Sequence, residues 1–371
     1  MAYIILNALD QSPISQDTNA ANAIAETVAL AQHCESLGYQ RYWVAEHHNT
    51  SSFAGAAPEI LMSYIAAKTN RIHIGSGGIM IGHYSPLKIA EQFQMLAALA
   101  PGRIDLGIGR APGGDMRTSA ALQAGPKAWP PEAFPEQAQM LRQFIEDAAG
   151  QTDAEGGFAT SHPYQGIHAQ PVGAIMPRMW MLGSGGDSAI YAAQFGLPYV
   201  YAHFIGGDDG QNVIQLYKDH FKPSQYLDTP YLGFAVSALV AETEKEADYL
   251  SGPRNLWATR HRTGQANVFS SLEEAAAYNY TETERDILEQ VKQRSLNGTP
   301  SHVVDRLENL SYNHDVDEFF VITITPDAEA RRASYGLLAE EVALRGKMRH
   351  ATDDKLNLLP EKLTAQGVTH R

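Results

Sequence analysis

Residues 71–115 read RIHIGSGGIMIGHYSPLKIAEQFQMLAALAPGRIDLGIGRAPGGD, and the rest of the chain can be interpreted from this stretch. Its first apolar run, residues 72–75, predicts a short buried strand. The strand is expected to end at the following Ser-Gly-Gly, because glycines let a backbone turn sharply or approach a flat ligand. Pro86 predicts the first turn of a helix. The stretch therefore begins as a strand followed by a helix.

The second half of the stretch completes this unit. One face of the helix is apolar at helical spacing, through Ile89, Phe93, Leu96 and Ala97. Pro101 and Gly102 end the helix, and residues 104–108 alternate in the manner of a strand. A strand, a helix and a second strand at this spacing predict two parallel strands with the helix packed against them.

The same pattern recurs along the whole chain. Eight segments resemble buried strands, near residues 4, 42, 73, 106, 180, 200, 236 and 321, and each is followed by a helical pattern. Eight such units predict an α/β fold, a (β/α)8 TIM barrel with its active site at the C-terminal ends of the strands. A doubly wound sheet is the alternative. Against it, no G-x-G-x-x-G follows the first strand, and glycine clusters follow the third, fourth and fifth strands instead.

Two long segments interrupt the pattern. They are residues 111–178 and 251–281, and a short polar tail closes the chain. Long excursions of this kind are typical of functional lids or disordered segments. Neither has enough periodic apolar sequence for a core of its own. We therefore expect residues 1–371 to form one barrel domain, with both excursions packed over its C-terminal face.

Composition excludes several classes of partner. The net charge of -14 argues against nucleic acid, which needs a clustered positive field. The one cysteine, Cys34, excludes an intrachain disulfide and fits a reducing compartment. The N-terminal sequence has no basic leader, and no apolar run approaches the ~18 residues of a membrane span. We expect a soluble cytoplasmic protein.

Glu46, His47 and His48 follow the second predicted strand and are the first candidate site. Adjacent residues on a strand point to opposite faces, so the two histidines are poorly placed to share a metal ion, and we predict no metal site. Both could be hydrogen-bonded residues of the barrel rim. A position at the C-terminal end of a barrel strand favours a role in the active site.

Two glycine-rich segments form the other candidates. Ser76, Gly77 and Gly78 could be a tight turn or a surface for a flat ligand. Arg110 follows the fourth strand, and Ser184, Gly185 and Ser188 lie where the fifth strand leads into a helix. A helix start of this kind binds phosphate readily, although the same residues also serve as ordinary helix caps.

Taken together and in this order, these motifs resemble those of the bacterial luciferase-like flavin-dependent monooxygenases. The resemblance is clearest over residues 39–115 and 179–202. It implies that His47 is the acid-base histidine, with Glu46 as its support at the flavin site. It also implies a non-proline cis peptide at Gly77-Gly78 beneath the flavin ring. The luciferases proper have an acidic residue near the position of Ser184, so the phosphate contacts there are expected to differ.

The resemblance further implies a reaction. Reduced FMN, supplied by a separate flavin reductase, would react with dioxygen to form a flavin C4a-peroxide, which oxygenates a small organic substrate. A homodimer is possible. Two alternatives remain open, a deazaflavin-dependent dehydrogenase on the same barrel and a flavin-binding protein without turnover.

Overall fold

The computed structural model describes residues 3–111, 114–123, 129–151, 158–159, 161–206, 209–265 and 267–349. Within these ranges, eight parallel strands close into a barrel in the order β1, β2, β3, β4, β5, β6, β7, β9. They are β1 (Ile5–Asp10), β2 (Arg41–Val44), β3 (His73–Met80), β4 (Ile104–Gly109), β5 (Arg178–Gly183), β6 (Tyr199–Ala202), β7 (Leu232–Val240) and β9 (Glu318–Ile322). The fold is a (β/α)8 TIM barrel, and each strand lies at a position expected from the sequence.

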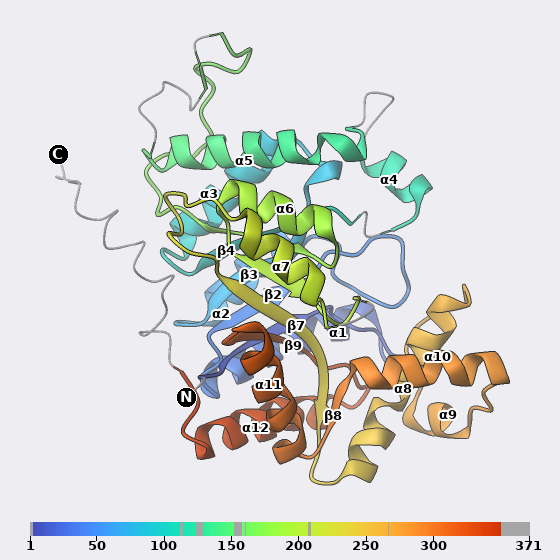
Figure 1. Cartoon of the computed structure of the whole chain (residues 1–371). Coiled ribbons are helices and arrows are strands. Elements are labelled where there is room, and N and C mark those ends of the chain that lie inside the picture. The colour runs from blue at the N-terminus through green and yellow to red at the C-terminus, as the bar shows by residue number, and fades with distance from the viewer. Residues whose placement is uncertain are drawn as a thin grey trace.

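Helices surround the barrel (Figure 1). In chain order they are α1 (Ala20–Ser36), α2 (Pro58–Lys68), α3 (Pro86–Leu99), α4 (Met116–Leu122), α5 (Phe134–Ala148), α6 (Gly186–Phe195), α7 (Gln211–His220), α8 (Glu244–Arg262), α9 (Leu272–Ala277), α10 (Glu282–Arg294), α11 (Pro300–His314) and α12 (Ala328–Leu344). The short 3-10 helices are η1 (Ile81–His83) and η2 (Pro131–Ala133). Prolines in the first turn start α2, α3 and α11, where the missing N–H costs nothing.

Two local expectations were wrong, and one element was not expected. β3 does not end at Gly75 but continues to Met80, because Ser76 and Gly107 tie it to β4 while the register shifts between Ser76 and Ile79. The second excursion is not irregular from residue 251, since α8 continues through Pro253 and buries Leu256. A short strand, β8 (Leu296–Gly298), extends β7 outside the barrel and had no expected counterpart.

The two excursions pack differently. α5, from the first excursion, lies against α3 on the outer side of the barrel. In the second, α8, α9 and α10 form one projecting group (Figure 1), and the chain returns to the barrel at Phe269, which pairs with Ser15. A single folding unit stays a prediction, which release of a stably folded fragment of either excursion by limited proteolysis would contradict.

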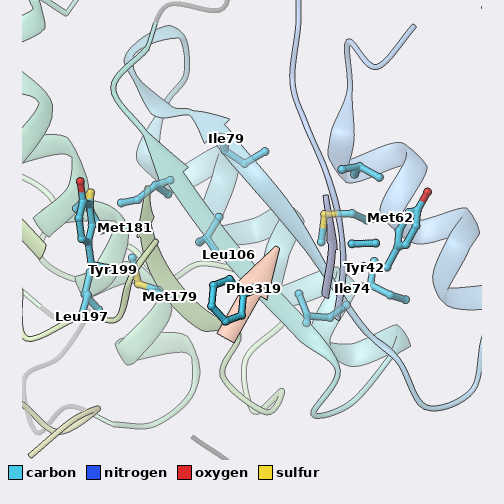
Figure 2. Packing of buried hydrophobic residues seen from close by; sticks show 14 of the residues in the cluster. Tyr42, Met62, Ile74, Ile79, Leu106, Met179, Met181, Leu197, Tyr199 and Phe319 are labelled. Atoms are coloured by element: carbon cyan, nitrogen blue, oxygen red, sulfur yellow. The ribbon is translucent and has the colours of Figure 1, made fainter. Parts of the chain in front are cut away.

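The buried side chains form two layers. Outward-facing residues of the strands pack against the helices, and Figure 2 shows part of this layer, with Ile74, Leu106 and Met181 from three neighbouring strands. Inward-facing residues fill the barrel with aromatic rings, including Trp43 and Trp180. In the ranges that the structure describes, no helix has both the length and the apolar composition to cross a membrane.

An ionic network lies at the N-terminal end of the barrel interior. Arg41 Nε is 2.6 Å from Glu318 Oε1, and its Nη1 is 2.9 Å from Asp105 Oδ2. The three side chains are fully buried. Trp43 donates its indole N–H to Asp105 at 3.0 Å, and the Arg41 guanidinium lies 5.0 Å from the ring centre of Trp180. The network therefore forms an ionic floor at the N-terminal end of the barrel and connects it to the aromatic side chains that fill the interior.

Arg41→Met should destabilise the barrel strongly, because it removes a buried cation that contacts two buried carboxylates. Removing one partner of a buried pair costs about 3–5 kcal/mol. Urea unfolding measures this loss. Lys292→Met is the matched control, since Lys292 pairs with Asp248 at 2.7 Å on the surface, where such pairs contribute about 0–1 kcal/mol. Similar losses in both variants would contradict the structural role of Arg41.

Candidate active site

Most of the candidate residues from the sequence gather at one end of the barrel. Glu46 and His47 follow β2, Gly77 and Gly78 lie in β3, and Arg110 follows β4. Because all barrel strands are parallel, their C-terminal ends meet around one mouth. Ser184, Gly185 and Ser188 follow β5 at the same mouth.

His47 is held by its backbone and by one ring contact. Its N–H donates to Gly55 O at 2.8 Å, and its imidazole stacks on Phe53 with ring centres 4.4 Å apart. Nδ1 is buried and has no hydrogen-bond partner within the described ranges. Burial, and secondarily the neighbouring His48, lower the pKa of His47 to about 4. The ring is therefore neutral at pH 7.

His48 has a different environment. Its Nε2 lies 2.7 Å from Glu46 Oε1, and Tyr84 donates to the same oxygen at 2.6 Å. The second oxygen of Glu46 accepts the Met80 N–H at 2.9 Å. Glu46 thus supports His48 rather than His47. Tyr84 had no sequence signal, because its role depends on a contact between β2 and the segment after β3.

Ser76, Gly77 and Gly78 lie in β3, next to the strand that precedes the two histidines. A cis peptide joins Gly77 to Gly78, as the family resemblance implied. A β-carbon at Gly78 would lie 2.7 Å from Gly107 O, so the strands leave no room for a side chain there. The buried Ser76 hydroxyl donates to Gly107 O at 2.9 Å and accepts from Gly107 N at 3.1 Å. Any contact of Ser76 with a ligand must therefore come from its backbone.

Arg110 and the start of α6 form the rim beyond β3, at the ends of β4 and β5. Gly185 caps α6 without a side-chain hydrogen bond, so the backbone N–H groups of the first turn face outward. Arg110 Nη1 lies 2.7 Å from Asp187 Oδ2, and both side chains are about half exposed, at 46% and 60%. The Ser188 hydroxyl donates to Gly185 O at 2.7 Å. Ser184 makes no side-chain hydrogen bond in the described part of the chain.

An aromatic group that sequence reasoning missed stands beside His47. Phe53 contacts Trp257 from α8 and Phe269 from the following segment, with ring centres 5.4 Å and 5.6 Å away. Trp257 Nε1 donates to Ser52 Oγ at 2.9 Å, which fixes α8 to the mouth. No periodicity in residues 251–281 indicated this, because the contacts are long-range. The mouth is therefore apolar near His47 and charged near Arg110.

Within the described residues, no group of three or more His, Cys, Asp or Glu side chains could hold a metal ion. The arrangement instead offers a helix start with an adjacent guanidinium, a narrow backbone surface and two histidines of different character. It can bind an anion at one rim and exchange protons at the other.

Known proteins resemble this chain over most of its length. The family model for luciferase-like monooxygenases matches residues 3–315. The N-acetyl-S-alkylcysteine monooxygenase of Bacillus subtilis (strain 168) is 37% identical over 342 residues, which cover 91% of this chain and 98% of that protein. The crystal structure of apo-MsnO8 superposes with a TM-score of 0.79 at 31% identity, over 92% of this chain and 99% of that one.

More distant structures share the fold alone. The oxygenating constituent of 3,6-diketocamphane monooxygenase from Pseudomonas putida, in complex with FMN, has a TM-score of 0.68 at 16% identity over 94% of this chain and 100% of that one. An F420-dependent secondary alcohol dehydrogenase has a TM-score of 0.67 at 14% identity over 92% and 99%.

The lowered pKa of His47 predicts a pH effect on stability. In the unfolded chain this pKa returns towards 6.5, so between pH 6.5 and 4 the unfolded state binds more protons than the folded state. Stability should rise with pH across this window. His47→Gln removes this effect. As the pH falls from 6.5 to 4, the free energy of unfolding measured in denaturant titrations should decrease by up to about 3 kcal/mol less in the variant than in the wild type. Parallel pH profiles would contradict the burial of a neutral ring.

Proposed function

The chain belongs to the luciferase-like monooxygenase family, and from this premise we propose that it is an FMN-dependent monooxygenase. It would take reduced FMN from a separate flavin reductase and use dioxygen to oxygenate a small organic substrate. The observation that carries the proposal is the glycine-capped start of α6 beside the half-exposed guanidinium of Arg110.

The phosphate of FMN fits this rim. Backbone N–H groups at a helix start and a guanidinium together favour an anion, even in a chain with a net charge of -14. Asp187 at present holds Arg110 and adds a negative charge to the same rim. Binding of phosphate would therefore require Arg110 to exchange or share this partner. Gly185 and the backbone of Ser188 would supply the other donors.

The flavin ring would lie against the backbone of Gly77 and Gly78. Bound reduced FMN would supply the electrons with which dioxygen is activated. His47, neutral at pH 7, would accept or return a proton at its ring nitrogen during transfer of oxygen. His48 would act as its neighbour, oriented by Glu46. Phe53 and Trp257 would exclude water beside His47.

The substrate and one alternative follow from the relatives. An N-acetyl-S-alkylcysteine is the first compound to test, because the B. subtilis relative is named for it. A deazaflavin-dependent dehydrogenase is the second candidate, and the shared fold with an F420-dependent enzyme is its support. It would reduce or oxidise its cofactor by hydride transfer without consuming oxygen, so oxygen uptake separates the two.

Arg110→Ala should weaken FMN binding by roughly 10- to 150-fold, the effect of losing one charge-assisted contact of about 1.5–3 kcal/mol. Riboflavin, which has no phosphate, should bind both proteins alike. Asp187→Asn is the matched control, since it breaks the same ion pair but removes the negative charge, so FMN affinity should hold or rise. Calorimetry measures these affinities. Equal losses of FMN affinity in the two variants would mean that the Arg110–Asp187 pair only maintains the structure of the segments after β4 and β5.

A monooxygenase should slow the loss of activated oxygen as hydrogen peroxide. Mixed with reduced FMN in air-saturated buffer, the wild type should release hydrogen peroxide more slowly than free flavin does. With substrate and labelled dioxygen, it should transfer one labelled oxygen atom to the product. His47→Ala should lower turnover about 10²- to 10⁴-fold at unchanged FMN affinity. A wild-type release curve identical with that of free flavin would exclude an oxygenase. Equal effects of His47→Ala and His48→Ala would remove the special role of His47.

We also propose a homodimer through the exposed face of α2 and α3. These helices contact each other and expose four large apolar residues by 55–70%: Ile60, Tyr64, Met95 and Leu99. Large exposed apolar side chains on two helices in contact favour an interface. Tyr64→Glu with Leu99→Glu should give a monomer in light scattering, whereas Tyr312→Glu, at a lone residue that is 87% exposed on α11, should not. A monomeric wild type would contradict this interface.

A further inference from the structure

A cavity of about 170 Å³ lies at the C-terminal face, between the segments that follow β1 and β9. Its walls come from the loop before α1, the first turns of α1, the loop before α12, and Phe269. In the barrel order, β9 and β1 stand diametrically opposite β4 and β5. The cavity is therefore across the mouth from Arg110, and no candidate residue from the sequence lines it.

One buried hydroxyl of the cavity lacks a partner within the part of the chain that the structure describes, and one guanidinium beside it has a nitrogen to spare. Thr325 lines it, is 4% exposed, and its hydroxyl has no hydrogen-bond partner in the described ranges. Arg331 lines it as well and is 3% exposed. Its Nε donates to Thr323 O at 2.9 Å and its Nη2 to Asp10 at 2.6 Å, whereas Nη1 has no acceptor among the described residues. The unpaired buried hydroxyl of Thr325 is costly, so the site favours a ligand that offers an acceptor to it, which Arg331 Nη1 can also contact.

The charges around the cavity are balanced. Asp10 neutralises Arg331, and Glu26, which also lines the cavity, pairs with Arg332. A free carboxylate would lose its hydration there without meeting an uncompensated cation. Three uncharged polar residues, Ser15, Thr18 and Asn22, also line the cavity. The apolar part of its wall consists of Pro13, Ala23, Phe269, Ile324, Pro326 and Ala328. The volume is below the ~300–1,000 Å³ of pockets for drug-sized ligands.

We propose that this cavity is a binding site for a small uncharged molecule with a carbonyl oxygen and a short alkyl chain, such as an aliphatic amide. The carbonyl oxygen accepts from Arg331 Nη1 and the Thr325 hydroxyl, and the alkyl chain packs on the apolar walls. Binding here does not depend on the proposed oxygenation, because it needs neither flavin nor the residues at Arg110.

The cavity is separate from the mouth but in contact with it. Phe269 is 1% exposed and stands between the two. Its ring contacts Phe53, which stacks on His47. An occupant that packs on Phe269 therefore lies two ring contacts from the candidate acid-base histidine.

Butyramide is the probe, and its binding to the full-length protein is measured by saturation-transfer NMR. The wild type should bind it saturably, and more tightly than butyrate. Ala328→Phe fills the cavity and should abolish binding, whereas Ala20→Phe, at an exposed position of α1 outside the cavity, should leave it unchanged. Thr325→Val should weaken binding by roughly 2- to 10-fold, the effect of one hydrogen bond.

Thr325→Val also tests the site without ligand. Removing a buried hydroxyl that has no partner should raise the Tm of the free protein, whereas loss of a satisfied hydroxyl would lower it. If Ala328→Phe fails to fold, Thr325→Val still tests whether the cavity binds a ligand through the Thr325 hydroxyl. The proposal is overturned if butyramide does not bind saturably, if butyrate binds equally well or better, or if Thr325→Val leaves butyramide affinity unchanged.

Discussion

The way the barrel interior is filled determines where a ligand can bind. Trp43, Trp180 and Phe320 pack ring against ring inside the barrel, above the ionic floor of Arg41. A β-carbon at Gly75 would collide with the Trp43 indole, and one at Gly77 would collide with Leu9. Gly75 is therefore required by the packing of the barrel itself, whereas the flexible end of Leu9 could move away from a side chain at residue 77. The filled interior leaves no room for a cofactor between the strands, so a cofactor would bind at the mouth, where the strands end.

The two sides of the mouth differ in the chemical groups that they present. The rim at β4 and β5 offers a guanidinium and a helix start, whereas the side at β2 offers a neutral histidine within aromatic packing. In the proposed complex, a cofactor with an anionic end and a flat ring would extend from the first to the second, with its reactive part beside His47. The two adjacent histidines then differ in role because only His48 has a buried carboxylate partner.

The sequence predicted the barrel because its strands and helices depend on local periodicity, and all eight barrel strands lie where the apolar segments indicated. It misjudged β3, whose continuation depends on the bond between Ser76 and Gly107, thirty-one residues later. It also did not predict that Glu46 pairs with His48, that Tyr84 bonds to Glu46, or that Trp257 lies at the mouth. Each depends on a contact between distant segments, for which a single sequence carries no signal.

The most direct test of the central claim is a crystal structure of the protein with FMN bound. The account predicts the phosphate within hydrogen-bond distance of Arg110 and the first-turn N–H groups of α6, with the ring against Gly77 and Gly78 and one edge towards His47. A phosphate bound at another rim of the barrel, or a ring that makes no contact with the backbone of β3, would contradict it.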